Sequence, residues 1–217
     1  MERKMDKLEE MLYFSTPVYV VKKPEFLEVV RSVSGRYEKA SKARKKTANY
    51  VNLMTASFSH EPELKDFSQY ISQTAWNILS SQGFKMDQLV TYFTEMWTQE
   101  HNRLSSMNLH VHGNNSQISV FYFFEVPEKA CKLVIHDPRP GKVIINLPEK
   151  KSSDITMGSH QVVFTPQVGA LIFINAWVPH SLSKNLSNKS MKFVHMNLSV
   201  AINPDAPKKA EKTVEVI

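Results

Sequence analysis

The chain has 217 residues, 42% hydrophobic and 22% charged, which is the balance of an ordinary globular protein rather than a disordered one. No apolar run approaches the roughly 18 residues that a membrane helix needs, and the charged start MERKMDKLEEMLYF lacks the apolar core of a secretion signal. The net charge of +6 permits an anionic partner, but it lies mostly in KASKARKK, EKK and the PKKAEK tail. Without a zinc-finger, helix-turn-helix or RNA-binding signature, nucleic-acid binding is not expected.

Cysteine content and length indicate the setting and the number of domains. Cys131 is the one cysteine, so no internal disulfide can form, and a reducing cytoplasm fits, which would be the host cytoplasm if the protein is viral. We expect a single domain over residues 1–205 and a flexible tail over residues 206–217. The sequence does not determine the oligomeric state, and a homodimer is compatible with it.

The first 60 residues mix short elements. YFSTPVYVV has the aromatic and β-branched character of a strand, and KKPEFLEVVRSV predicts a short helix that begins at Pro24. Residues 36–60 are polar with few apolar anchors and are typical of a loop with at most one strand.

Two helices are expected between Pro62 and Arg103, where the apolar period is helical. LKDFSQYISQTAWNIL places Phe67, Ile71 and Trp76 near one stripe, which Leu79 extends. After the turn SSQG, a second helix is predicted over MDQLVTYFTEMWTQEH. Its inward residues would be Leu89, Tyr92, Phe93 and Trp97.

From Asn108 onward the pattern changes to strands and turns. The β-like runs are HVH, ISVFYFFEV, KLVIHDP, KVIINL, HQVVFTP, GALIFINAW and MKFVHMNLSVAI. Pro, Gly and Asn punctuate them, and so many short strands predict a sandwich or barrel. The expected fold is mainly β with packing helices. Residues 1–103 would supply N-terminal strands and packing helices, and residues 104–205 the β core.

Two histidines occupy alternate positions in MNLHVHGNNS. On a strand, His110 and His112 would project to the same face, about 7 Å apart along the backbone. His180 follows 68 residues after His112, where the apolar run GALIFINAW enters a turn. In a barrel these sites can meet at the mouth, and three imidazoles suit Fe, Zn, Cu or Ni. The alternative is that the pair consists of surface residues next to a loop.

The order of several motifs resembles a family of 2-oxoglutarate/Fe(II)-dependent oxygenases common in phages and marine bacteria. The matching stretches are WTQEHNRLSSMNLHVHGNNSQISVFYFFEVPEKACKLVIHDPRP, PQVGALIFINAWVPHSLSKNLSN and MNLSV, over about residues 90–200. The family is similar to prolyl hydroxylases. The resemblance therefore implies a double-stranded β-helix (jelly roll) core that holds Fe(II) at its open end.

The resemblance also implies which residues bind the metal. The ligands carry over to His110 and His180, while His112 stands where most 2-oxoglutarate oxygenases have a carboxylate. If His112 does not bind the ion, Asp137 in HDPRP is the nearest replacement carboxylate, although the position before Pro138 is typical of a turn residue. No catalytic residue is expected beyond the metal ligands.

The cosubstrate 2-oxoglutarate needs a cation for its distal carboxylate. The resemblance implies Lys192 as that cation, although aligning MNLSV on the family ending puts Met191 at the position of the family's arginine. Arg139 is the reserve candidate. Tyr122 and Asn197 are further candidates for cosubstrate contact, with core packing and internal hydrogen bonding as their structural alternatives.

The function implied is an Fe(II)/2-oxoglutarate-dependent dioxygenase that uses O₂ to hydroxylate an unidentified substrate. One alternative is a cupin-type metalloenzyme with a three-histidine site that does not use 2-oxoglutarate. Another is a catalytically inactive phage barrel or binding protein, which the missing arginine and carboxylate would allow.

Overall fold

The computed structural model describes residues 8–44, 52–113, 115–144 and 147–205, and within them ten strands form two antiparallel sheets. The major sheet has the order β1-β8-β5-β10-β3-β2 and the minor sheet the order β4-β9-β6-β7. The strands are β1 Val18–Lys22, β2 Asn52–Met54, β3 Leu89–His101, β4 Met107–His110, β5 Ile118–Glu125, β6 Leu133–His136, β7 Gln161–Phe164, β8 Ala170–Asn175, β9 His180–Leu182 and β10 Met191–Ile202.

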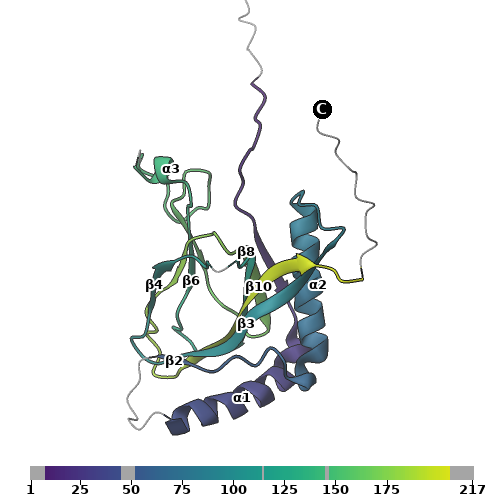
Figure 1. Cartoon of the computed structure of the whole chain (residues 1–217). Coiled ribbons are helices and arrows are strands. Elements are labelled where there is room, and N and C mark those ends of the chain that lie inside the picture. Colours follow the sequence, from purple (N-terminus) through teal and green to yellow (C-terminus); the bar gives the residue numbers. More distant parts are fainter. Residues whose placement is uncertain (1–7, 45–51, 114, 145–146, 206–217) are drawn as a thin grey trace, which may run out of the picture.

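Two long helices cover the major sheet on the side away from β4 and β6 (Figure 1). The 3-10 turn η1 (Pro24–Phe26) leads into α1 (Leu27–Arg44), and η2 (Pro62–Leu64) leads into α2 (Lys65–Ser81). Proline stands first in each turn, where its fixed φ suits a helix start and its missing N–H costs no hydrogen bond. The short α3 (Pro140–Ile144) lies between β6 and β7.

The major sheet separates two apolar cores. On β5, Val120 and Tyr122 belong to the core shared with the helices, whereas Phe121 and Phe123 belong to the core between the two sheets. Alternate residues of a strand point to opposite faces, so a one-residue step along β5 or β10 moves a side chain from one core to the other. This alternation decides which side chains can reach the inside of the barrel.

The architecture confirms the fold predicted from the sequence, a mainly β protein with packing helices. The stripe predicted for the first long helix after Pro62 is also confirmed. Phe67, Ile71 and Leu79 of α2 are buried, and the Trp76 indole donates a hydrogen bond to the Leu89 carbonyl at 2.9 Å.

The second helix predicted after SSQG is wrong, because its residues form β3, which pairs with β10 along its whole length. The pairing has a bulge that skips Thr94, so Leu198 lies opposite Phe93 and Asn197 opposite Glu95. The bulge shifts the alternation by one residue. Phe93 and Met96, three residues apart, then both face the helices. Inward residues three apart are typical of a helix, which explains why the sequence predicted one here.

The interpretation of residues 36–60 as a loop was also wrong in part. Helix α1 continues through this polar stretch to residue 44, and β2 supplies the one strand, while residues 45–51 lie outside the described part. The major sheet draws β1, β2 and β3 from before position 103, so that position does not separate packing elements from the barrel. The proposed tail, residues 206–217, also lies outside the described residues.

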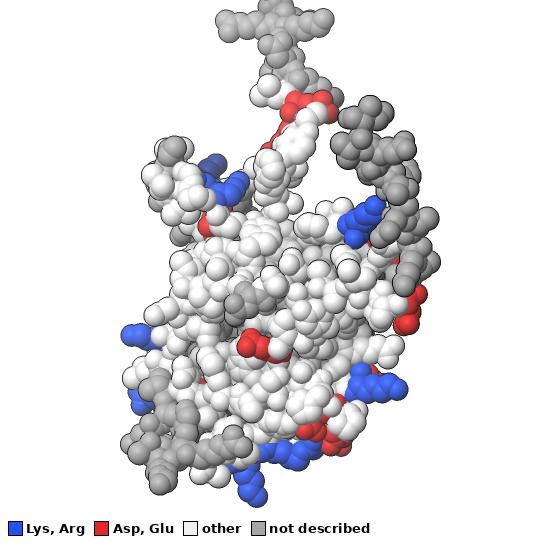
Figure 2. Space-filling view, viewed as in Figure 1, with Lys and Arg blue, Asp and Glu red and all other residues white. Residues whose placement is uncertain are grey.

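The surface and helix composition bear on possible partners. Among the described residues, the helices are too short or too polar to cross a lipid bilayer. On the face shown in Figure 2, Lys and Arg side chains are scattered near the rim, and the middle of that face is uncharged apart from one acidic group. The positive net charge therefore does not form one continuous basic surface on this face.

Candidate metal centre

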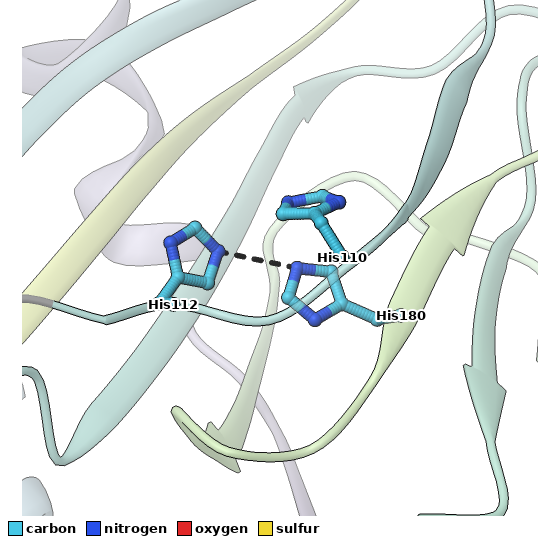
Figure 3. A group of neighbouring side chains, drawn as sticks. All are labelled: His110, His112 and His180. Atoms are coloured by element: carbon cyan, nitrogen blue, oxygen red, sulfur yellow. Dashed lines mark hydrogen bonds between the residues drawn. The ribbon is translucent and has the colours of Figure 1, made fainter.

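Three imidazoles from two neighbouring minor-sheet segments converge at one end of the barrel. His110 ends β4 and His180 begins β9, and the antiparallel pairing places their Cα positions directly opposite each other. His112 follows β4, held by a hydrogen bond from its backbone N–H to the Ala176 carbonyl at 3.0 Å. The predicted convergence of these histidines is thus present, with all three rings turned toward a common centre (Figure 3).

The spacing of the three rings is close to that of a metal site. One ring nitrogen from each histidine lies within 4.8 Å of the others, and Nε2 of His112 is 3.3 Å from Nε2 of His180. A transition metal bound at about 2.1 Å separates its ligand nitrogens by roughly 3–4 Å. Small side-chain rotations would therefore bring the three nitrogens to bonding distance from one ion.

Backbone carbonyls fix the orientation of two of the rings. Nδ1 of His110 donates to the Asn108 carbonyl at 2.8 Å, and Nδ1 of His180 donates to the Val178 carbonyl at 3.0 Å. A carbonyl oxygen only accepts, so both neutral rings carry their proton on Nδ1 and keep a lone pair on Nε2. This is the second-shell arrangement that holds a histidine ready for a metal.

His112 is held differently, through Asn197 of β10. The Asn197 amide nitrogen donates to Nδ1 of His112 at 3.2 Å and to the Glu95 carboxylate at 3.3 Å. The amide oxygen of Asn197 accepts a hydrogen bond from the Ser119 hydroxyl at 2.8 Å. Because an ionised carboxylate only accepts, Glu95 fixes the direction of the amide. Neutral His112 then carries its proton on Nε2, facing His180, and must move that proton before it can bind an ion.

Burial keeps His112 and His180 neutral. Desolvation lowers the pKa of His112 to about 4 and of His180 to about 3, and the neighbouring imidazoles lower both pKa values further. Neutral imidazole is the form that binds metals, so protons compete weakly with an ion at neutral pH. Three neutral ligands would leave the full +2 charge of Fe(II) on the centre.

A fourth histidine, unassigned by the sequence analysis, packs against the triad from the major sheet. The ring of His195 lies 4.7 Å from the rings of His112, Phe121 and Trp97, and the residue is 2% exposed. Neither of its ring nitrogens has a hydrogen-bond partner, and the buried Nε1 of Trp97 also has none. Alternation along the strand could have identified His195 from the sequence, because residues two apart, such as His195 and Asn197, point to the same face.

The structure does not bring Lys192 or Tyr122 to the triad. Lys192 forms ion pairs with Glu38 at 3.0 Å and Glu125 at 3.3 Å, and the Tyr122 hydroxyl donates to the Lys23 carbonyl at 2.7 Å. Both side chains lie on the helix face of the major sheet. Lys192 lies an odd number of residues from His195 on β10, and Tyr122 follows Phe121 on β5, so both point to the opposite face of the sheet. The expectation that they lie in the cosubstrate pocket is therefore corrected.

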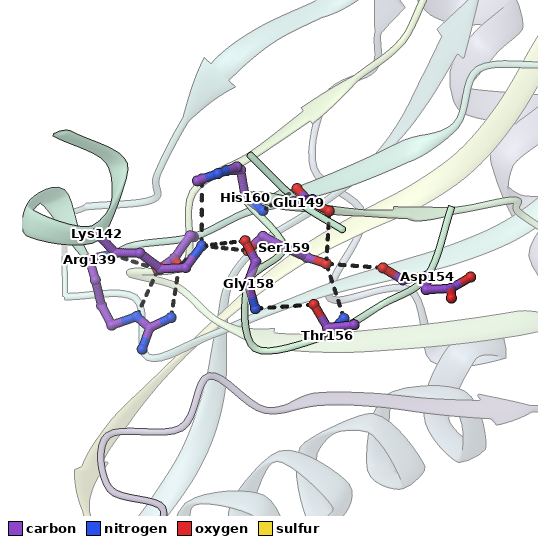
Figure 4. Close-up of polar contacts among 9 residues, drawn as sticks. Arg139, Lys142, Glu149, Asp154, Thr156, Gly158, Ser159 and His160 are labelled. Atoms are coloured by element: carbon purple, nitrogen blue, oxygen red, sulfur yellow. Dashed lines mark hydrogen bonds and ion pairs between the residues drawn. The ribbon is translucent and has the colours of Figure 1, made fainter. Parts of the chain in front are cut away.

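Arg139 and Asp137 bind each other in the segment after β6 instead of reaching the triad. The guanidinium donates from Nε at 3.0 Å and from Nη2 at 2.8 Å to the two carboxylate oxygens, and Lys142 lies 3.3 Å from the same carboxylate. The Arg139 hydrogen bonds are the main cause that lowers the pKa of Asp137. Figure 4 shows this network continuing through Lys142 into the loop before β7. Asp137 is not part of the histidine group.

Cys131 has no sign of chemical activation. The thiol is buried in the core between the sheets, and burial raises its pKa to about 11. It behaves as an apolar core residue.

Residues 95–194 match a family model described as "Putative 2OG-Fe(II) oxygenase". The match spans β3 to the first strand positions of β10 and includes all three histidines of the triad. No curated protein matches the chain. The family resemblance inferred from the sequence is confirmed by this match.

Several solved structures share the fold at low sequence identity. The α-ketoglutarate-dependent carbocyclase SnoK of nogalamycin biosynthesis has a TM-score of 0.61 at 11% identity, covering 87% of this chain and 83% of that one. AviO1 from Streptomyces viridochromogenes has a TM-score of 0.58 at 11% identity, covering 90% and 93%. A Pseudomonas putida prolyl-4-hydroxylase has a TM-score of 0.56 at 8% identity, covering 85% and 94%. These similarities confirm the double-stranded β-helix.

Proposed function

We propose that this chain, whose residues 95–194 match the 2OG-Fe(II) oxygenase family model, is an Fe(II)- and 2-oxoglutarate-dependent dioxygenase. The observation that carries the proposal is the convergence of His110, His112 and His180 at the end of the barrel. Iron bound there would supply the activation of O₂ and the oxidation of a C–H bond in the substrate. The substrate itself stays open.

The donor set suits iron. Two of the three rings present a lone pair on Nε2 in a fixed orientation, and imidazole is a common ligand of Fe(II) in open oxygenase sites. All three ligands lie on the minor-sheet side, which would leave the opposite side of the ion accessible to small molecules. His112 completes the set once its ring proton moves from Nε2.

The residues around the triad orient it and exclude water. Phe121 places the edge of its ring against His180 at 5.3 Å and against His195 at 4.7 Å, so the triad borders the apolar core between the two sheets. In such a dry environment the electrostatic interactions of an ion with its ligands are stronger than in water. The chain thus contributes ligand geometry and exclusion of solvent, while the hard chemistry belongs to the metal.

The test is formation of succinate from 2-oxoglutarate by the Fe(II)-loaded protein in air, compared with the His180→Ala variant. We expect turnover by the parent protein and none by the variant. His136→Ala is the matched control, because this histidine lies on the neighbouring strand β6 and contacts Ser181 instead of the triad. Absence of succinate with every substrate class, together with stoichiometric iron, would overturn the cosubstrate assignment.

A three-histidine oxygenase that does not use 2-oxoglutarate is the second candidate. It is favoured by Met191, a buried apolar residue on the interior face of β10, and by the position of Lys192 on the opposite face. O₂ consumption with iron but without 2-oxoglutarate would support it. A protein that binds no metal at all would instead support the inactive barrel.

A further inference from the structure

We propose that the His195 and Trp97 side chains form a neutral binding site for the distal carboxylate of the metal-chelating 2-oxo acid. The inference rests on the proposed function, since it places a second contact for the ligand of the same metal centre. Five buried side-chain polar atoms of the described residues have no hydrogen-bond partner, and three of them lie together: both ring nitrogens of His195 and Nε1 of Trp97. The other two, Ser68 Oγ and His160 Nε2, come from residues outside this pair.

Buried donors without partners are rare in folded proteins, because each loses its hydrogen bonds to water and gains nothing in return. Here two residues with such atoms are neighbours across β3 and β10, where Trp97 and His195 are paired in register. Their rings are 4.7 Å apart and tilted by 31°. Two adjacent residues with unused donors indicate a binding site for an acceptor more specifically than one isolated orphan atom does.

The location fits a ligand that is already bound to the metal. His195 contacts His112 directly, with the ring centres 4.7 Å apart, and it approaches the triad from the major sheet. The three histidines occupy the minor-sheet side, so a chelating ligand would extend from the ion into the space between the two sheets. On the major sheet, His195 contacts the triad and has two ring nitrogens without a hydrogen-bond partner.

The chemistry of the two side chains suits an anionic oxygen. The indole Nε1 only donates, and a neutral imidazole supplies one N–H donor. A carboxylate can accept from both, and hydrogen bonds to a charged acceptor are stronger than bonds between neutral groups. The cationic candidates are engaged elsewhere, Lys192 with Glu38 and Glu125 and Arg139 with Asp137. Recognition by two neutral donors is therefore the arrangement that this chain offers.

Measuring two ligands against two proteins tests the site. 2-Oxoglutarate and 2-oxobutyrate share the chelating 2-oxo acid end, but only the first carries a distal carboxylate. Their dissociation constants are measured by calorimetry with the Mn(II)-loaded protein under conditions without turnover. We expect 2-oxoglutarate to bind about 10 to 100 times more tightly, which corresponds to one or two charge-assisted hydrogen bonds.

The variants His195→Phe and Trp97→Phe keep an aromatic ring but remove the donors. Each should reduce the preference for 2-oxoglutarate by about tenfold and leave the binding of 2-oxobutyrate and Mn(II) unchanged. Trp76→Phe is the matched control, because it removes an indole whose donor is bonded to the Leu89 carbonyl, away from the triad. Melting temperatures of all variants verify that they are folded.

An unchanged preference in both folded variants would overturn the proposed carboxylate site. So would equal affinity of the parent protein for the two ligands. Failure of the proposed function looks different, because a protein that does not bind Mn(II) would bind neither acid. Loss of affinity for both acids in His195→Phe alone would show that His195 supports His112, and it would also overturn the site.

Discussion

On the face of the major sheet that meets the helices, Tyr122 donates to a backbone carbonyl and Lys192 is paired with Glu38 and Glu125. On the opposite face, toward the minor sheet, His195 and the indole nitrogen of Trp97 have no partner. These two polar groups on the first face hold the fold together. On the second face Asn197 and Ser119 are also bonded, but His195 and the indole nitrogen of Trp97 are left available beside the three histidines, and this difference separates the structural face from the functional one.

Acidification should lower the free energy of unfolding through the buried histidines on the inner face of the major sheet, the face toward the minor sheet. Burial lowers the pKa of His101 and His112 to about 4, of His180 to about 3 and of His195 well below its ordinary value. Between pH 6.5 and 4 the unfolded chain binds protons at these sites and the folded protein does not, so stability present above pH 6.5 is lost on acidification. A shift of two units is worth roughly 3 kcal/mol per histidine.

Denaturant titrations at pH 7, 6, 5 and 4.5 measure this loss. His195→Phe removes one of the titrating groups from the inner face, so its stability should depend less steeply on pH than that of the parent protein. A free energy of unfolding that stays constant from pH 7 to pH 4.5 would contradict the assignment of neutral buried imidazoles.

Removal of one triad ligand should abolish tight metal binding. His180→Ala takes away the ring that lies opposite His110 and whose Nε2 is 3.3 Å from Nε2 of His112, so the Mn(II) dissociation constant should rise more than the roughly 100-fold typical of second-shell changes. Calorimetry gives the constant. His136→Ala, on the neighbouring strand, should bind Mn(II) within about twofold of the parent; an equal loss there would point to general disruption of the minor sheet.

Asn197→Asp, made together with Glu95→Gln so that no second carboxylate faces the new one, should strengthen metal binding by about tenfold. An aspartate at this position would accept from Nδ1 of His112, which moves the ring proton away from Nε2 and leaves that nitrogen free for the ion. Asn175→Asp is a suitable control, because Asn175 is also a buried amide of the major sheet but is bonded to Gln82. Weaker metal binding in the double variant than in the control would show that the tautomer of His112 does not limit the site.

On the helix face, Lys192→Met should lower the free energy of unfolding by about 1–2 kcal/mol, because Glu38 is largely buried and loses its nearest cation. Binding of Mn(II) and of 2-oxo acids should not change. Chemical denaturation and calorimetry check the two statements separately. A loss of 2-oxoglutarate affinity would return Lys192 to the cosubstrate site.

The smallest effect is expected for Tyr122→Phe. The variant keeps the ring packed against Phe67 and loses one hydrogen bond to the Lys23 carbonyl, at a cost of about 1 kcal/mol. The melting temperature should fall by roughly 2–4 °C. Tyr13→Phe, at an exposed tyrosine, should leave it unchanged, and an effect of Tyr122→Phe on ligand binding would contradict the separation of the two faces.

The sequence by itself determined most strands after Asn108, the packing helix α2 and the identity of the three converging histidines, although KVIINL, also expected as a strand, begins in helix α3. These features depend on local periodicity and on alternation along a strand, which neighbouring residues reveal. The tertiary structure decided what the sequence left open. The β3 bulge turned an apparent helix into a strand, and strand register placed Met191 and Phe121 inside the barrel while Lys192 and Tyr122 face the helices. Register and bulges arise from pairing between distant segments, so no local pattern in β3, β5 or β10 contains them.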